Sequence, residues 1–247
     1  MARNEFLQEL IKIKKSNLES RPYNQLIASS ETSMKNFVLL VFIFPCLLCA
    51  AKKDPHPLTK LNQWFQDEQD PAGGRLHKFA TLASVSATNK PYTRVVELVK
   101  VSPQSGLVFF THKNSIKVGH FSANPHAALN IYLPKTGRQI SLAGKVFPVP
   151  KEDVTKAWRR MPRSLKLATL LSDHAREATS LKALEKRKQA LQTRYKQAAI
   201  PAPPTFVGFS FHPEEVIFFQ IRRGTFPIKE IAALDEHQRW SYTLVDP

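Results

Sequence analysis

The stretch from Tyr92 to Gly144 constrains the fold of this chain more than any other part of the sequence. Four strand-like runs follow one another in it, separated by turn sequences such as SPQSG and KTG, and a short helix starts at Asn114-Ser115. The runs predict a small barrel, because β-branched and aromatic residues suit strands that are half buried in a pleated sheet. These residues are Val95, Val96, Val99, Val108, Phe109, Phe110, Ile131 and Ile140.

Helical patterns flank these strands. Asp54 to Gln69 has four apolar residues at helical spacing, which predicts an amphipathic helix. Three more helices are expected at 151–160, 163–173 and 178–197, and prolines from Pro201 to Pro204 end this section. The apolar positions expected to face inward are Leu58, Leu61, Trp64 and Phe65 in the first helix, and Leu181, Leu184, Leu191 and Tyr195 in the last.

Further strands are expected on both sides of the helical section. One precedes the central stretch, at 79–87, and four follow the prolines, at 208–211, 216–220, 228–234 and 240–244. The sequence therefore predicts one domain, residues 54–247, that is mainly β with helices (α+β).

Polar side chains recur where the strands of the central stretch end or turn. They are basic or amide residues, namely Arg94, Lys100, Lys117, Arg138 and Gln139. A small barrel whose rim carries several cations suggests a site for a phosphorylated ligand, because phosphate oxygens accept strong charge-assisted hydrogen bonds. The alternative is a basic protein whose lysines and arginines are only solvated.

The order and spacing of these residues resemble the pyridoxamine 5′-phosphate oxidase family, flavoproteins with an FMN-binding split β-barrel. The shared pattern is an Arg that leads an apolar strand to a Lys, an aromatic-Thr pair, a Ser-x-Lys that opens a helix, and an Arg-Gln. In this chain the pattern reads Arg94-Val95-Val96 to Lys100, Phe110-Thr111, Ser115-Ile116-Lys117 and Arg138-Gln139. The resemblance implies a Greek-key split barrel from strands within 79–148 and 207–244, with a helical insertion at 151–197.

The resemblance also implies FMN as the cofactor. In the family, the strand Arg, the helix-opening Lys and neighbouring hydroxyl groups hold the FMN phosphate, which assigns this role to Arg94, Lys117 and Thr111, with Gln139 near the isoalloxazine ring. A lysine at a helix N-terminus suits a dianionic phosphate. The complete cofactor set implied by the resemblance is Arg94, Val95, Lys100, Phe110, Thr111, Lys117, Gln139, Phe219 and Lys229.

This chain departs from the family pattern at the cofactor site. Ile116 stands where the family has the first of two basic residues, and Phe219 stands where it has a Trp. The Gln-Ser pair expected after the second helix is His174-Ala175. We expect FMN to bind despite these changes, but more weakly.

The substrate side departs further. The family holds the substrate phosphate with a Lys, a Tyr, an Arg and a Ser. In this chain Lys100 takes the position of the Lys. The other three positions are occupied by side chains that cannot bind phosphate, namely Ala157, Met161 and Leu165. The Arg-x-His that contacts the substrate over the flavin in the family falls at Thr225-Phe226-Pro227, and Arg222 or Arg223 is the candidate to substitute there. Each lost charge-assisted contact costs about 1.5–3 kcal/mol, so normal turnover of pyridoxamine phosphate is not expected.

Two functions follow from this resemblance. The first is an FMN-dependent oxidoreductase of the oxidase type, resembling the enzymes that form pyridoxal phosphate but with an altered substrate. The second is a non-catalytic split-barrel protein that binds flavin or pyridoxal phosphate. The resemblance further implies a C2 homodimer, whose interface builds the flavin sites in the family.

Composition narrows the choice of partners. The formal net charge of +16 would attract nucleic acid, anionic membranes or phosphorylated small molecules. No zinc-finger spacing, RRM-like motif or Arg/Gly-rich tail is present, so no nucleic-acid partner is expected. Cys46 and Cys49 lie in one apolar segment and the eight histidines show no H-x-x-x-H spacing, so no metal site is expected either. The expected partner is a phosphorylated or other small-molecule substrate.

The N-terminal region contains a segment that resembles a secretory signal peptide. Met34-Lys35-Asn36 precedes a dozen apolar residues and the small-residue end at Cys49-Ala50-Ala51. Residues 1–33 form an extension that is not translated if the chain starts at Met34. If the segment 34–51 is a working signal, the protein is exported and the mature chain has no stable membrane span; otherwise it is cytoplasmic.

Overall fold

The computed structural model describes residues 55–70, 76–172 and 180–247. The extension at 1–33, the signal-like segment at 34–51 and the His174-Ala175 pair lie outside the described residues. No helix within the described ranges is long and apolar enough to cross a membrane.

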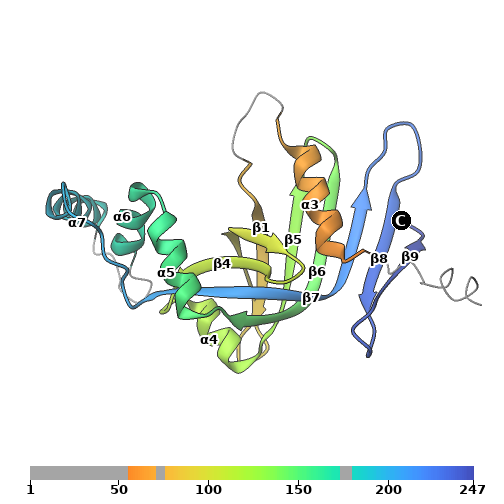
Figure 1. The fold of residues 1–247 in the computed structure, drawn as a ribbon, viewed down its shortest axis with the longest axis horizontal. Helices are drawn as coiled ribbons and strands as arrows, with labels where there is room; N and C mark the ends of the chain where they lie inside the picture. Colours follow the sequence, from red (N-terminus) through yellow and green to blue (C-terminus); the bar gives the residue numbers. More distant parts are fainter. Residues whose placement is uncertain (1–54, 71–75, 173–179) are drawn as a thin grey trace, which may run out of the picture. The chain divides into compact units, whose positions relative to one another are not determined.

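Five helices and nine strands occupy the described ranges (Figure 1). The helices are α3 (Pro57–Glu68), α4 (Ile116–Ala123), α5 (Lys151–Arg160), α6 (Arg163–Leu171) and α7 (Leu181–Arg194). The strands are β1 (Phe79–Val85), β2 (Pro91–Glu97), β3 (Lys100–Ser102), β4 (Gly106–His112), β5 (His126–Leu133), β6 (Arg138–Pro148), β7 (Phe206–Gln220), β8 (Ile228–Leu234) and β9 (Trp240–Val245).

All the strands join one antiparallel sheet that curls into a split barrel. Its order is β2-β1-β5-β6-β7-β4-β3, with β8 paired to β7 and β9 paired to β8. The ladder between β6 and β7 is irregular at Ala143-Gly144, because Glu214 of β7 is an extra residue between the pairs Ala143–Glu215 and Gly144–Pro213. A Cβ on Gly144 would lie 2.1 Å from the carbonyl oxygen of His212, so only glycine fits this close approach.

The inner face of the sheet and α3 enclose the main core. Leu58, Leu61, Trp64 and Phe65 of α3 are all buried, as their spacing predicts. The Trp64 ring meets Phe218 of β7 edge-on, with 5.1 Å between the ring centres. The predicted split barrel with helices is therefore confirmed.

Two strand predictions are wrong in detail. The run PYTRVVELVKV was expected to be one strand, but it divides into β2 and β3 at Leu98-Val99 because the two halves pair with different neighbours, β1 and β4. The strands expected at 208–211 and 216–220 are one strand, β7. It continues through Pro213 because that residue lies next to the extra residue Glu214, where the regular ladder is interrupted.

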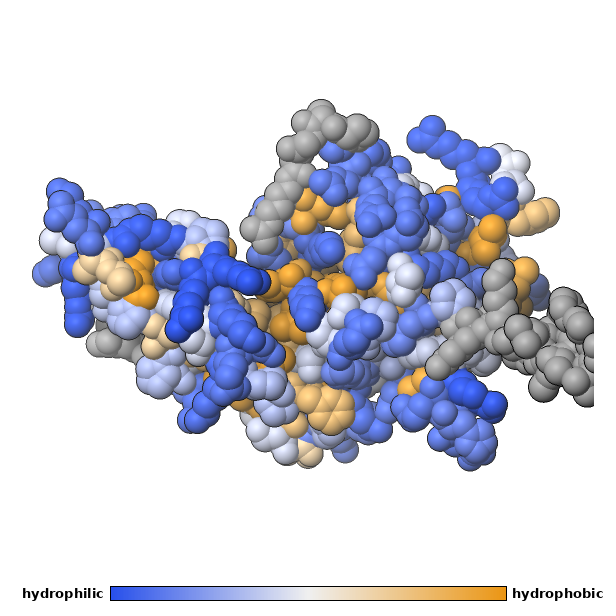
Figure 2. Space-filling view, viewed as in Figure 1, coloured by the Kyte–Doolittle hydropathy of each residue, from blue (hydrophilic) through white to orange (hydrophobic). Residues whose placement is uncertain are grey.

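The three helices after β6 lie at the N-terminal end of β7, and their own small core consists of Trp158, Ile200 and Phe206 (Figure 1). The expectation that Leu181 faces inward is wrong, since this side chain is 86% exposed. Leu184, Leu191 and Tyr195 are only half buried. Helix α7 packs mainly against α6, so part of its apolar face remains uncovered by the described residues, although hydrophilic residues dominate the visible face of this region (Figure 2).

Candidate functional site: two cationic regions

The first region is a group of four side chains, Arg94, Thr111, Ser115 and Lys117, called here the cation cluster. Arg94 lies opposite Leu82 in the β1–β2 pair, on the inner face, and its Nη1 donates to Ser84 Oγ at 2.6 Å. Lys117 lies in the first turn of α4. Its Nζ donates to Thr111 Oγ1 at 3.0 Å and to Ser115 Oγ at 2.5 Å.

Neither cation of the cluster has a counter-ion among the described residues. No ion pair joins Arg94 or Lys117 to a carboxylate within the described residues. Lys117 is nevertheless only 8% exposed. Burial, reinforced by the charge of Arg94, lowers the pKa of Lys117 to about 8, and burial also lowers the pKa of Arg94. Uncompensated buried charge destabilises a fold, so this cluster is suited to an anion that would neutralise it.

The surroundings of the cluster supply neutral hydrogen-bonding groups. Ser84 Oγ, which accepts from Arg94, also lies 2.9 Å from Nδ1 of buried His120. Burial and the charge of Arg94 lower the pKa of His120, which favours its neutral form. The first turn of α4 adds backbone N–H groups that have no acceptor inside the helix. Cations, hydroxyls and a helix N-terminus together match a phosphate.

A second set of expected cofactor residues lies on the outer face of the sheet. Gln139 is opposite Phe219, and Phe219 is opposite Lys229, so the three form one row across β6, β7 and β8. Val95 shares this outer face and is 64% exposed. Among the described residues, no hydrogen bond or ion pair joins this row to the cation cluster.

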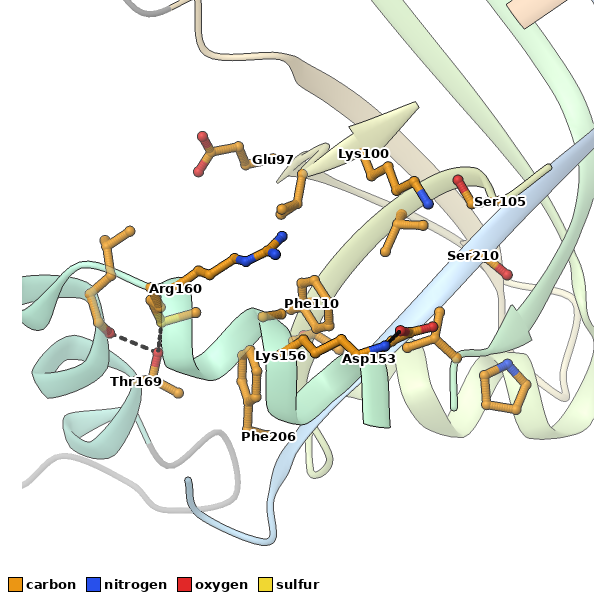
Figure 3. A pocket seen from close by; sticks show the side chains of 18 of the residues that line it. Glu97, Lys100, Ser105, Phe110, Asp153, Lys156, Arg160, Thr169, Phe206 and Ser210 are labelled. Atoms are coloured by element: carbon orange, nitrogen blue, oxygen red, sulfur yellow. Dashed lines mark hydrogen bonds and ion pairs between the residues drawn. The ribbon is translucent and has the colours of Figure 1, made fainter. Parts of the chain in front are cut away.

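The second cationic region is a pocket of 1070 Å³ between the helices α5 and α6 and the strands β3, β4 and β7 (Figure 3). Lys100 and Phe110 both line it. Thr111 lines it as well, and this residue therefore connects the pocket with the cation cluster. The size is at the upper end of the range for small-molecule sites.

The pocket contains the three positions at which the sequence predicts a departure from the family's substrate site. Ala157, Met161 and Leu165 all line it, and they contribute apolar surface. Arg222 and Arg223 lie in the exposed segment between β7 and β8, and neither lines this pocket. Their suggested part in substrate binding stays a prediction.

Sequence reasoning overlooked Arg160, which also lines the pocket. A signal for it was present: Lys156 and Arg160 are four residues apart in α5 and therefore share one face of the helix. Arg160 also immediately precedes Met161, the position at which the family pattern has an arginine and this chain does not. Within the described residues, no group of His, Cys, Asp and Glu could hold a metal ion.

Comparisons with known proteins identify the family of this chain. The family described as "Pyridoxamine 5'-phosphate oxidase" matches residues 72–220, more than half of the chain. The pyridoxine/pyridoxamine 5'-phosphate oxidase of Granulibacter bethesdensis is 33% identical over 168 residues, which cover 66% of this chain and 78% of that protein. The corresponding oxidase of Gloeothece citriformis is 29% identical over 200 residues, covering 81% and 92%.

Solved structures show the same fold. PhzG from Burkholderia lata, crystallised with tetrahydrophenazine-1-carboxylic acid, superposes with a TM-score of 0.71 at 25% identity and covers 78% of this chain and 95% of its own. An FMN-binding protein from Nostoc punctiforme, related to pyridoxamine 5'-phosphate oxidase, superposes with a TM-score of 0.56 at 19% identity, covering 69% and 88%. The match over residues 72–220, the curated relatives and the split barrel lead to one conclusion: the chain belongs to the pyridoxamine 5′-phosphate oxidase family.

Proposed function

We propose that this protein is an FMN-dependent oxidoreductase of the oxidase type, and that the cation cluster holds the phosphate of FMN. The supporting observation is the pair of buried Lys117 and half-buried Arg94, which has no carboxylate partner among the described residues. Two cations with two neighbouring hydroxyls fit a dianion, because each charge on the phosphate then receives a charge-assisted hydrogen bond. FMN would supply the redox chemistry by accepting a hydride equivalent and passing its electrons on.

The residues of the chain then have separate tasks. Lys117 and Arg94 neutralise the phosphate, while Thr111 and Ser115 keep the Lys117 amine in place through their hydroxyl oxygens. The outer row of Gln139, Phe219 and Lys229 offers amide, aromatic and cationic groups to the ring system. The Arg94 side of the cluster lies on the inner face of the sheet and this row lies on the outer face, so a second chain would bring such groups together at one flavin.

We therefore propose a C2 homodimer that forms through the outer face of the sheet. Val95 is 64% exposed and Tyr132 is 59% exposed on this face, and surface of this kind commonly marks an interface. Replacing both by Glu should convert a dimer into a monomer in light scattering and should weaken FMN binding at the same time. A wild-type protein that is monomeric at micromolar concentration would contradict this proposal.

The substrate is proposed to be less charged than a vitamin B6 phosphate. Support comes from the apolar side chains of Ala157, Met161 and Leu165 in the pocket. PhzG, which is similar to this chain, was crystallised with a ring compound that carries a carboxylate and no phosphate. The alternative, a protein that binds flavin or pyridoxal phosphate without turnover, is favoured by the same loss of phosphate-binding side chains.

The test combines cofactor uptake with turnover. Purified protein should take up one FMN per chain, measured by absorbance after removal of free flavin. The loaded protein should be assayed aerobically with pyridoxamine and pyridoxine phosphates, following pyridoxal phosphate and peroxide. Uptake of FMN with little turnover is the expected result. A chain that excludes FMN overturns the cofactor proposal, and rapid turnover of either phosphate overturns the altered substrate.

A further inference from the structure

The charges in the pocket are only partly compensated. Its two acidic residues have basic neighbours: Asp153 Oδ1 lies 3.4 Å from Lys156 Nζ, and Glu97 Oε1 lies 3.0 Å from His77 Nδ1. Lys100 and Arg160 also line the pocket. No ion pair joins either of them to a carboxylate in the described ranges. The pocket thus has a surplus of positive charge at these two residues.

Arg160 is placed to meet a ligand. It is the last residue of α5, and Figure 3 shows its side chain reaching from the helix into the space beside the strands that carry Lys100 and Phe110. Among the described residues it makes no hydrogen bond to another side chain. A guanidinium presents a planar pair of donors, which matches the two oxygens of a carboxylate.

The rest of the pocket is apolar and aromatic near Arg160. Phe110 stacks on Phe206, with 5.2 Å between ring centres and 17° between ring planes. Trp158 meets Phe206 edge-on at 5.0 Å and thereby fixes its position. Val99 and Met161 complete this side of the lining. A flat ring could extend the stack at Phe110, whereas a small, strongly hydrated dianion would gain little from this surface.

We propose that Arg160 binds the anionic group of the substrate, and that the substrate is a flat, apolar monoanion such as an aromatic carboxylate. This inference rests on the proposed function, because it assigns a substrate class to the pocket of the same site. It makes Arg160 the residue that determines specificity, in place of the phosphate-binding side chains that are absent at Ala157, Met161 and Leu165.

The test uses three probes and the FMN-loaded protein. The probes are 1-naphthoate, its neutral analogue 1-naphthamide, and pyridoxal 5′-phosphate, and binding is measured by calorimetry. Wild-type protein should bind 1-naphthoate more tightly than either other probe. Arg160→Ala should weaken 1-naphthoate binding by about tenfold or more and should leave 1-naphthamide binding nearly unchanged. Arg160→Lys should recover part of the loss.

Arg159→Ala is the matched control. Arg159 is the preceding residue of the same helix and is exposed, but it does not line the pocket. This variant should bind all three probes like the wild type, and both variants should give the wild-type circular dichroism spectrum and FMN affinity. Equal losses in the two variants, equal binding of naphthoate and naphthamide, tighter binding of pyridoxal 5′-phosphate, or no binding of any probe would each overturn the inference.

The same titrations on flavin-free protein separate this inference from the proposed function. A chain that takes up no FMN but binds 1-naphthoate through Arg160 refutes the cofactor proposal and supports the role of Arg160. A chain that takes up FMN but shows no difference between Arg160→Ala and Arg159→Ala refutes only the inference about Arg160.

Discussion

The cation cluster and the pocket are both positively charged, but they differ in how their cations are held. Lys117 is 8% exposed and is fixed by two hydroxyl groups, whereas Lys100 and Arg160 are exposed at the pocket. A buried cation without a counter-ion destabilises the fold until an anion binds, but an exposed cation costs little. The difference suggests that the cluster is specialised for one anion, while the pocket can change its ligand through a few side chains.

The largest expected effect is the loss of FMN affinity when the cation cluster is removed. Replacing both Arg94 and Lys117 by Met should weaken FMN binding by more than about a hundredfold, because each charge-assisted contact contributes about 1.5–3 kcal/mol. The flavin-free variant should be at least as stable as the wild type, since two uncompensated charges are removed. Fluorescence titration with FMN and thermal unfolding measure the two effects.

A matched pair of exposed residues controls for the change in net charge. Lys151 and Lys182 lie on α5 and α7, and both are exposed. Replacing these two by Met should leave FMN affinity almost unchanged. If the Lys151/Lys182 variant loses as much FMN affinity as the Arg94/Lys117 variant, the loss comes from the change in net charge. The proposed difference between the cluster cations and exposed cations is then wrong.

The next largest expected effect is a loss of stability in the helices that form one wall of the pocket. Trp158 is 4% exposed, and its indole nitrogen donates to the carbonyl oxygen of Ile200 at 2.9 Å. Trp158→Ala should destabilise the helical section by about 3–5 kcal/mol, and with it the pocket wall at Phe206. FMN affinity should change far less, because no side chain of the cluster contacts Trp158. Urea unfolding and FMN titration check this, and a parallel loss of both properties would show that the two regions are not independent.

A pH dependence should distinguish the regions as well. The pKa of Lys117 is lowered to about 8, so FMN affinity should fall between pH 7.5 and pH 9, approaching about tenfold per pH unit, as the amine loses its proton. Riboflavin, which lacks the phosphate, should show little change over this range. The same titration of Lys117→Met should be nearly flat, and an equally steep fall in that variant would assign the effect to another group.

The stability of the flavin-free protein should change in the opposite direction. The pKa of Lys117 in the folded chain is lower than the unfolded value of about 10.4, so between the two values the unfolded chain binds more protons. The free energy of unfolding contributed by this residue therefore rises with pH from about 8 to about 10.4. The thermal midpoint of Lys117→Met should exceed that of the wild type at pH 7, and the gap should narrow towards pH 10.

The smallest expected effect is a gain in FMN affinity. Ile116 is 64% exposed at the start of α4 and stands where the family pattern has the first of two adjacent basic residues. Ile116→Lys should strengthen FMN binding several-fold, consistent with about 0.2–1 kcal/mol for an exposed ion pair. The gain should disappear at high salt, whereas the contribution of buried Lys117 should persist. No gain at low salt would place the phosphate away from this helix start.

The fold could be predicted from the sequence because its signals are local, and so could the position of Lys117 at a helix start beside Thr111. Strand patterns, the turn sequences and Ser115-Ile116-Lys117 at a helix start each involve neighbouring residues. The division at Leu98-Val99 could not be read this way, since it depends on which distant strands pair with each half. Arg160 was missed for a related reason: its role depends on α5 facing β3 and β4 across the pocket, which is a property of the tertiary structure.

The central claim is that the cation cluster binds the phosphate of FMN, and the most direct measurement compares FMN with riboflavin on the same flavin-free protein. The two ligands share the ring and the ribityl chain and differ only in the phosphate. Wild-type protein should bind FMN at least about a hundredfold more tightly than riboflavin, and the variant with Met at positions 94 and 117 should lose most of this difference. Equal affinities for the two ligands in the wild type would contradict the account.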